Sequence, residues 1–327
     1  MKKFTKLALA ASVAFSANAM AMQAMDDASL SATTGQDGLS IGIGISKIEI
    51  EKLFIHDNDG YSGTGGTGEA GAIYIKANGE GATAAHGVVI GANYDDNGAY
   101  LLASRNLADL TIDSDAGAGN PFINIAAEVS GLDINIGEIG VVGSASSLTD
   151  YENGLASATS IRRGGAGKEN AILSGLSLKT GPMSANIQLG AAPQGAMIKL
   201  NATMIGGLTI ENLGILDNST AGGTVADGVT TSGPGEIFIE SIKLTDAGTK
   251  DLTLNQSISV FGESTANDGF IRIVSTSGAH DNYVKGIHLG SRTAASIGDM
   301  EIQGLQTYFS PAQGTYVPGA IITIAGH

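Results

Sequence analysis

Apolar residues repeat in steps of five along several segments of this 327-residue chain. The first such segment contains the aliphatic positions Ile41, Ile43, Ile45, Ile48, Ile50, Leu53 and Ile55. Runs of alternating side chains are thus separated by two skipped residues, and the step returns in residues 198–215, 237–244 and 297–305. Residues i and i+2 of a strand lie on one face, so a skipped pair reverses the facing unless the backbone turns or bulges there.

This pattern predicts an all-β fold. At helical spacing the same positions would scatter around the axis, and the many Ile, Thr and Gly residues disfavour helix. A corner at each skipped pair gives an elongated β-solenoid-like body with irregular coils, which is our first prediction. A bulge at each pair gives the same facing in an antiparallel sheet, so a β-sandwich or mixed antiparallel β body is the alternative.

The N-terminus has the organisation of a signal peptide. Lys2, Lys3 and Lys6 precede the short apolar run 7–15, which is too short to span a bilayer. Small residues then allow cleavage after Ala19 or Ala21. We therefore expect export through a signal peptide spanning residues 1–21.

The remaining chain divides by composition into two parts. Residues 22–40 contain the acidic pair Asp26-Asp27 and, near their end, Gly38, and we expect them to cap the open end of the coil. Residues 41–327 form a Gly-rich β body. Its longest turn-rich stretch, residues 217–235, is the best candidate for a projecting loop or for a boundary between halves. No stretch after the signal peptide resembles a membrane helix.

Charge and cysteine content exclude several classes of protein. The chain has 32 acidic against 17 basic residues and a formal net charge of −15, which argues against nucleic-acid binding and against docking to an anionic membrane. It has no Cys, so the exported protein has neither a disulfide framework nor a thiol for metal binding.

One motif resembles a known family. The segment Met25-Asp26-Asp27, Leu30-Ser31-Ala32 and Thr34-Gly35-Gln36-Asp37-Gly38, placed just after the signal peptide, is similar to the N-terminus of FilA-like putative pilus-assembly proteins of Gram-negative bacteria. The match covers roughly residues 22–41. The resemblance implies a location in the periplasm or at the cell surface and a link to pili or fimbriae, and it implies no catalytic residues.

Calcium is the only cofactor that the sequence suggests. Asp57-Asn58-Asp59-Gly60 alternates oxygen-bearing side chains before a Gly, which suits a hard cation. However, an EF-hand loop would require Glu at the position of Gly68. A turn is therefore the main interpretation, and Asp57 and Asp59 are the candidate ligands if calcium binds.

An enzyme is the competing hypothesis. Parallel β-helices host polysaccharide-cleaving enzymes, and paired carboxylates could serve such a reaction, with Asp95, Asp96, Asp113 and Asp115 as candidates by residue type only. The five His residues show no metal spacing, and no nucleophile elbow or phosphate-binding loop is present. Arg162, Arg163 and Lys168 form the only basic cluster.

We therefore expect a non-enzymatic structural protein of the cell envelope, involved in pilus assembly or surface attachment. Its partners would be pilus or envelope proteins, bound through the edges of strands. A secreted β-helix protein that binds or cleaves polysaccharide is the alternative function.

Overall fold

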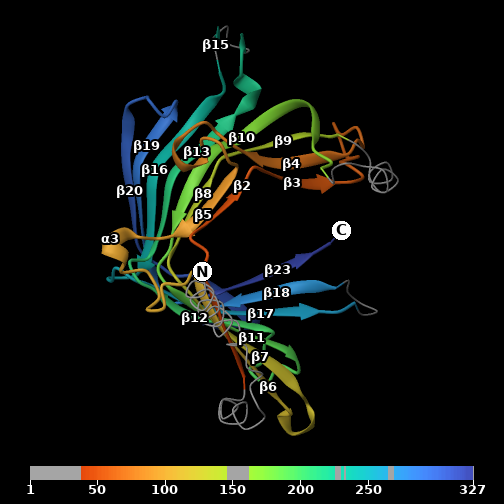
Figure 1. Ribbon diagram of the computed structural model, residues 1–327. Helices are drawn as coiled ribbons and strands as arrows, with labels where there is room; N and C mark the ends of the chain where they lie inside the picture. The colour runs from red at the N-terminus through yellow and green to blue at the C-terminus, as the bar shows by residue number, and fades with distance from the viewer. Residues whose placement is uncertain (1–37, 146–161, 225–229, 232, 264–268, 327) are drawn as a thin grey trace, which may run out of the picture. The chain divides into compact units, whose positions relative to one another are not determined.

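The computed structural model describes residues 38–145, 162–224, 230–231, 233–263 and 269–326 and confirms an all-β protein. The chain divides into two units, Met1–Leu39 and Ser40–His327, and nearly all of the described residues belong to the second. The expected signal peptide and most of the expected cap segment lie outside the described residues. Two large sheets account for most of the second unit (Figure 1).

Sheet A has eight strands in the order β1-β6-β7-β11-β12-β17-β18-β23, with antiparallel pairing from β6 to β23. Their bounds are β1 (Leu39–Ile43), β6 (Ala108–Asp115), β7 (Phe122–Val129), β11 (Met183–Gly190), β12 (Ile198–Met204), β17 (Leu252–Phe261), β18 (Phe270–Ser275) and β23 (Ala320–Ala325).

Sheet B has eleven strands, and its main order is β2-β5-β8-β10-β13-β16-β19-β20. These strands are β2 (Lys47–Ile50), β5 (Val88–Ala92), β8 (Leu132–Ile136), β10 (Gly165–Lys179), β13 (Leu208–Asp217), β16 (Gly235–Asp246), β19 (His280–Gly290) and β20 (Ser296–Leu305). A branch β3-β4-β9 joins β10 through β9 and comprises β3 (Lys52–Asp57), β4 (Gly71–Lys76) and β9 (Glu138–Ser144).

The other described elements are short. Two hairpins stand apart from the large sheets: β14 (Gly223–Thr224) with β15 (Thr230–Thr231), and β21 (Tyr308–Ala312) with β22 (Thr315–Pro318). The helical elements are η1 (Gly81–Thr83), α3 (Asp95–Gly98), η2 (Gly117–Gly119) and η3 (Asn218–Thr220).

The solenoid prediction is wrong, and the antiparallel alternative describes the fold better. Neighbouring strands in sheet B pair antiparallel, and β10 and β16 have 15 and 12 residues instead of the short arms of a coil. The expected boundary at residues 217–235 connects two strands that pair directly, since Asp217 of β13 lies opposite Gly235 of β16. The small β14–β15 hairpin extends from this connection (Figure 1).

In the long strands of sheet B, the five-residue step marks positions where the strand pairing is interrupted. Between β13 and β16, Glu211 lies opposite Ser241 and Leu213 lies opposite Ile239, so Asn212 and Glu240 are left out of the pairing while the register is kept. Glu240 contacts both Lys285 and His288, which lie on either side of the matching interruption in β19. Polar side chains on both sides of the interruption therefore share one face.

Aliphatic rows run straight across both sheets. In sheet A, paired positions on seven strands are all isoleucine: Ile112, Ile125, Ile187, Ile198, Ile258, Ile273 and Ile322. In sheet B one row crosses eight strands, as Ile48, Ile90, Ile134, Leu178, Ile210, Ile242, Val284 and Met300. Such cross-strand aliphatic pairs stabilise the sheets and fix their register.

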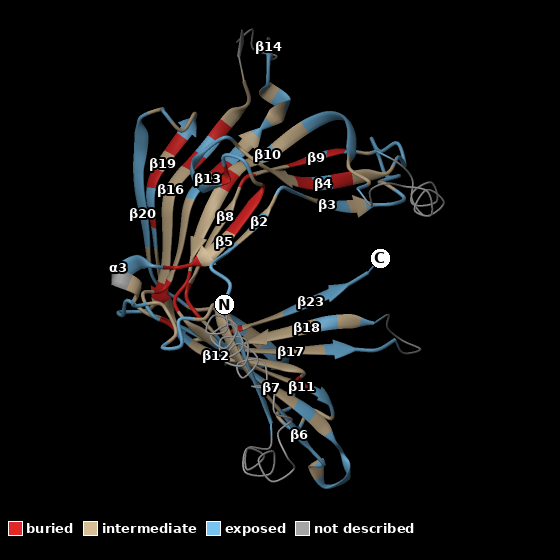
Figure 2. Cartoon of the chain, viewed as in Figure 1, coloured by how far each residue is buried: buried red, intermediate tan, exposed pale blue. Residues whose placement is uncertain are grey.

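Several of the best-buried residues lie where the chain crosses from one sheet to the other. The crossing segments include residues 130–131, 180–182, 205–207 and 247–251, and they are joined by hydrogen bonds. Ser130 is fully buried; its hydroxyl donates to the Asn106 carbonyl at 2.8 Å and accepts from the Leu102 amide at 3.0 Å. Figure 2 shows buried residues around these crossings and on β4, β9 and β19.

The unpaired residue Asn212 in β13 allows a direct test of the interruption between β13 and β16. Asn212 has φ of 57°, in the left-handed region, where a β-branched side chain is strained. We expect Asn212→Val to lower the free energy of unfolding by about 1–2 kcal/mol, as measured by urea denaturation. Asn201→Val, at an exposed position of β12 without positive φ, is the matched control and should change it by less than about 0.5 kcal/mol. If Asn212→Val and Asn201→Val lowered the free energy of unfolding equally, the left-handed conformation of Asn212 would be contradicted.

Candidate functional site

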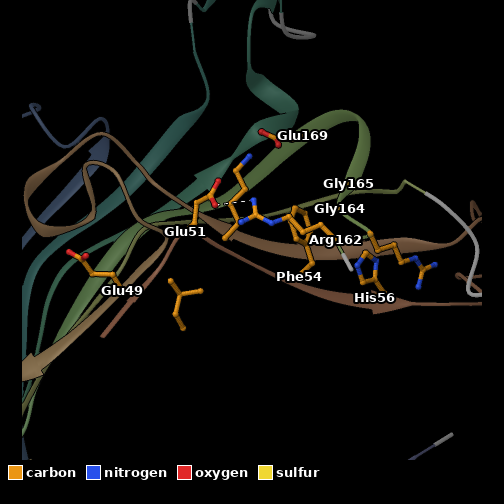
Figure 3. Close-up of a pocket in the computed structure, with 11 residues that line it drawn as sticks. Glu49, Glu51, Phe54, His56, Arg162, Gly164, Gly165 and Glu169 are labelled. Carbon is orange, nitrogen blue, oxygen red and sulfur yellow. Dashed lines mark ion pairs between the residues drawn. The ribbon is translucent and has the colours of Figure 1, made fainter. Parts of the chain in front are cut away.

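A pocket of about 820 Å³ lies beside β2 and β3, under the segment that leads into β10 (Figure 3). Its lining residues are Glu49, Ile50, Glu51, Lys52, Phe54, His56, Arg162, Arg163, Gly164, Gly165 and Glu169. The pocket brings two of the residues in the predicted basic cluster next to acidic and aromatic side chains. It is the candidate site that we consider first.

Three acidic residues that line the pocket form ion pairs. Arg162 Nη1 lies 3.0 Å from Glu51 Oε2, the ion pair drawn in Figure 3. Lys47 pairs with Glu49 and, by its hydrogen bond, lowers the pKa of that carboxyl. Glu169 pairs with Lys76. The lowered pKa of Glu49 is the opposite of the raised pKa that a general acid needs.

His56, which lines the pocket, lies beside a hydroxyl from outside the lining. His56 Nδ1 lies 3.0 Å from Ser144 Oγ, and the imidazole stacks on Phe54 with a centroid distance of 5.9 Å. Burial and the nearby Arg163 lower the pKa of His56. A catalytic triad instead places a carboxylate beside the imidazole to stabilise its protonated form. The Arg163 guanidinium therefore acts on His56 in the opposite direction to the carboxylate of a triad.

A small apolar cluster packs beneath the pocket. Phe54 lies against Ala72, Tyr74 and Val142, and Tyr74 is the largest fully buried side chain among the described residues. Its hydroxyl donates to Glu138 Oε1 at 2.7 Å, and Lys76 Nζ lies 3.1 Å from the same oxygen. Burial first, and the Glu138 carboxylate second, raise the pKa of Tyr74. Tyr74 is thus a structural anchor that stays protonated.

The Tyr74 hydroxyl bond can be tested by a single deletion. We expect Tyr74→Phe to lower the free energy of unfolding by about 1 kcal/mol, because one buried hydrogen bond to a charged acceptor is lost. Urea denaturation would measure the change. Tyr316→Phe removes a hydroxyl from an exposed side chain in β22 and should change the stability by less than about 0.5 kcal/mol. A neutral Tyr74→Phe would show that the hydroxyl bond contributes nothing.

A second polar cluster, which we call the Arg292 cluster, consists of Arg292, Glu236, Ser174 and Glu80. Arg292 Nη2 and Nε lie 2.9 and 3.3 Å from the two carboxylate oxygens of Glu236, and Ser174 Oγ donates to the same carboxylate at 2.7 Å. Arg292 Nη1 reaches Glu80 at 2.6 Å. Glu236 is buried, and although its burial alone would raise its pKa, the hydrogen bonds from Arg292 and Ser174 hold the pKa below the ordinary value.

The candidate calcium ligands lie in a turn. Asp57 Oδ1 accepts the backbone amides of Asp59 and Gly60, each at 3.4 Å, which is the pattern of an Asx turn. Within the described ranges, no group of three or more His, Asp and Glu side chains is arranged to hold a metal ion. Calcium binding at Asp57 and Asp59 therefore stays a prediction, with the turn as its structural context.

The candidate catalytic acids lie in separate contexts. Asp95, in α3, is exposed and lies 3.3 Å from Lys179 Nζ. Asp113 and Asp115 are exposed on β6 of sheet A, and Asp115 Oδ1 accepts the Gly117 amide at 2.6 Å. The side chain of Asp96 lies outside the described part. No contact between Asp95 and the β6 acids is present among the described residues.

Sequence reasoning missed the Arg292 cluster and the Tyr74 cluster. Glu80 and Arg292 are 212 positions apart, and neither lies in a recognisable motif. Four of the histidines also acquire partners that spacing did not indicate: Ser144 for His56, Glu49 for His86, Asp246 for His280, and Glu240 for His288. His327 lies outside the described residues.

Of the described helices, none is long and apolar enough to cross a membrane.

Comparisons with known proteins gave one match, to a family of unknown function. No curated protein and no solved structure matches the chain. Residues 1–135, which include β1 to β7 and most of β8, are similar to a family of unknown function, DUF6160.

Proposed function

We propose that the mature chain is an exported, non-enzymatic structural protein of the cell envelope that takes part in pilus assembly or surface attachment. Its location would be the periplasm or the surface of a Gram-negative bacterium. The N-terminal pattern of a signal peptide and the resemblance to FilA-like proteins support this proposal. The ion pairs of Arg162 with Glu51 and of Lys76 with Glu169 agree with a scaffold.

The observation that carries the proposal is an unprotected sheet edge. Among the described strands, β23 ends sheet A and pairs with β18 alone. Its sequence AIITIA contains no charged residue and no proline, the two devices that most often prevent pairing at an edge. Unpaired amides and carbonyls on such a strand can accept a strand from a pilin or another envelope protein.

The edge strand β20 of sheet B provides a contrast. β20 ends sheet B and is exposed along most of its ten residues. It carries Asp299 and Glu301, and its Gly298 and Gly304 have positive φ. Charges and backbone irregularities of this kind discourage strand addition. β23 is therefore the edge that we assign to partner binding.

A deletion strain complemented with variants tests the function. We expect deletion to reduce pili and adhesion, and Ile322→Lys/Ile324→Lys not to restore them, because lysines on β23 oppose strand addition. Both residues are exposed, so the protein should still fold and be exported. Tyr316→Lys, on the neighbouring β22, is the matched control and should restore both phenotypes. Normal pili and adhesion in the deletion strain would refute the proposal.

A further inference from the structure

The free side of β23 determines what kind of molecule can bind there. Among the described strands, β18 alone pairs with β23, so the backbone groups that point to its other side have no strand partner. Figure 1 shows β23 at the rim of sheet A. Backbone amides and carbonyls at such an edge are satisfied by one further strand. The side chains of β23 then decide which strand fits.

Two aliphatic rows of sheet A end at this edge. The seven-strand isoleucine row ends at Ile322, and a neighbouring row passes from Val260 through Ile271 to Ile324. Ile322 and Ile324 are each 53% exposed. Cross-strand side-chain pairs are the unit that stabilises an antiparallel sheet. A strand that extends sheet A therefore has to place aliphatic side chains beside both isoleucines on the same face.

β23 of a second copy of the chain meets this requirement. Two identical edge strands related by a twofold axis perpendicular to the sheet are antiparallel, and an axis at Thr323 places this residue opposite its own counterpart. Ile322 of each copy then lies opposite Ile324 of the other, so both aliphatic rows continue across the axis. An axis at Ile322 would instead pair Ile324 with the smaller Ala320. Thr323 therefore gives the better register.

Charge does not oppose this pairing, although the chain as a whole is acidic. The five strands from β11 to β23 contain no Asp or Glu, and their charged residues are Lys199 and Arg272. The acidic residues of sheet A lie on β6 and β7, toward its other edge. The Arg272 side chains of the two copies would be three strand spacings apart, or about 14 Å, which exceeds the Debye length of about 8 Å.

The other edge strands of the two large sheets fit a second copy less well. β2, β3 and β20 each carry charged residues, which disfavour strand addition. β1 is uncharged, but it contains Gly42, and a glycine weakens a strand. Pairing of β1 with β23 of the next copy would also be a heterologous contact, which builds an open filament instead of a closed dimer.

We propose that β23 pairs with β23 of a second copy of the chain, so that sheet A continues through a twofold axis at Thr323 in a dimer. The inference rests on the β23 edge of the proposed function and names the strand that occupies it. The two can fail separately. A monomeric protein would leave the edge to a strand of another envelope protein, whereas normal pili in the deletion strain would leave the dimer standing.

Sedimentation equilibrium of the full mature chain tests the dimer. We expect the average mass to rise from monomer toward dimer between about 1 and 100 µM, since a short strand edge supports a weak dimer. Thr323→Lys should weaken the dimer by about tenfold or more, because two like charges then face each other on the axis. Tyr316→Lys, on the exposed β22, is the matched control and should retain the dimer affinity within about twofold.

Mixing two variants tests the register itself. Thr323→Glu should weaken self-association less than Thr323→Lys, because Arg272 lies opposite residue 323 on β18. An equal mixture of the Thr323→Lys and Thr323→Glu proteins should form a dimer again, since opposite charges then face each other across the axis. Circular dichroism and thermal unfolding would establish that each variant is folded.

Any of four results would overturn the inference. The first is an unaltered protein that stays monomeric up to about 100 µM. The second is a dimer that Thr323→Lys does not weaken, or that Tyr316→Lys weakens equally. The third is a mixture of the two Thr323 variants that remains monomeric. The fourth is association that continues past the dimer, which would assign the β23 edge to β1 of a following copy.

Discussion

Gly181→Val should lower the free energy of unfolding by at least about 3 kcal/mol. Gly181 lies in the crossing segment between β10 and β11, where a Cβ atom would meet both the amide nitrogen and the carbonyl oxygen of Ile205 at 2.5 Å. These are backbone atoms of the neighbouring crossing segment, so they cannot move away as a side chain would. The strain would fall on the hydrogen-bonded region that joins the two sheets.

The matched control is a glycine in open space. Gly278, in the crossing segment between β18 and β19, has no atom within 4 Å of a built Cβ and no positive φ. Gly278→Val should change the free energy of unfolding by less than about 0.5 kcal/mol. Urea denaturation followed by circular dichroism would measure both variants. A Gly181→Val protein as stable as Gly278→Val would show that the two crossing segments are not in close contact.

Arg292→Met should cost about 2–4 kcal/mol at neutral pH. The substitution keeps most of the side-chain volume but removes the guanidinium, which leaves the buried Glu236 carboxylate with the Ser174 hydroxyl and the backbone amide of residue 292 as donors. A buried charge without its counter-ion is much more costly than the loss of the ion pair itself. Arg292→Met/Glu236→Leu should therefore recover a large part of the lost stability.

The loss of stability in Arg292→Met should depend on pH, because it depends on the charge of Glu236. The pKa of Glu236 lies below its ordinary value of 4.5, so its stabilising contribution is present above that value and is lost as the pH falls through the lowered pKa. In Arg292→Met, burial is no longer offset by the guanidinium and raises the pKa. The difference in the free energy of unfolding between Arg292→Met and the unaltered protein should then become smaller as the pH decreases from neutral. The reason is that burial of a protonated carboxyl costs less free energy than burial of a carboxylate.

Chemical denaturation over a series of pH values would measure this difference. Lys285→Met is the matched control, since Lys285 pairs with Glu240 at 3.3 Å on the same strand-rich face but is largely exposed. It should cost less than about 1 kcal/mol. If the stability loss in Arg292→Met did not change with pH, this explanation would be contradicted. The loss would then come from packing and not from the charge of Glu236.

Much of the secondary structure could be predicted from the sequence. The alternation of Ile48, Ile50, Leu53 and Ile55 predicted strands with one aliphatic face, and the cross-strand pairs of sheet B agree with that facing. A bulge at each skipped pair was predicted as one of two ways to keep the facing, and between β13 and β16 the structure instead leaves one residue of each strand unpaired without a change of register. What the pattern could not decide was the direction of the neighbouring strand, since a corner of a coil and a bulge in an antiparallel sheet use the same residue types.

Much less of the candidate site could be predicted from the sequence. The motif Asp57-Asn58-Asp59-Gly60 drew attention because its residues are adjacent, and the structure places it in an Asx turn. Tyr74 meets Glu138 across 64 positions, and Arg292 meets Glu236 across 56. Contacts at such separations follow from strand order and register, which no local pattern contains.

The sequence by itself determined that the protein is built of strands with an aliphatic and a polar face, because side-chain alternation is a local property of the backbone. Only the tertiary structure decided that the strands form two antiparallel sheets joined at tightly packed crossings. It also decided that Arg292 packs over Phe238 on the polar face of sheet B, while Ile215, Ile237 and Leu289 on the aliphatic face stay exposed. These outcomes depend on which distant strands pair and where the connecting loops fold back, and both are set by packing across the whole chain.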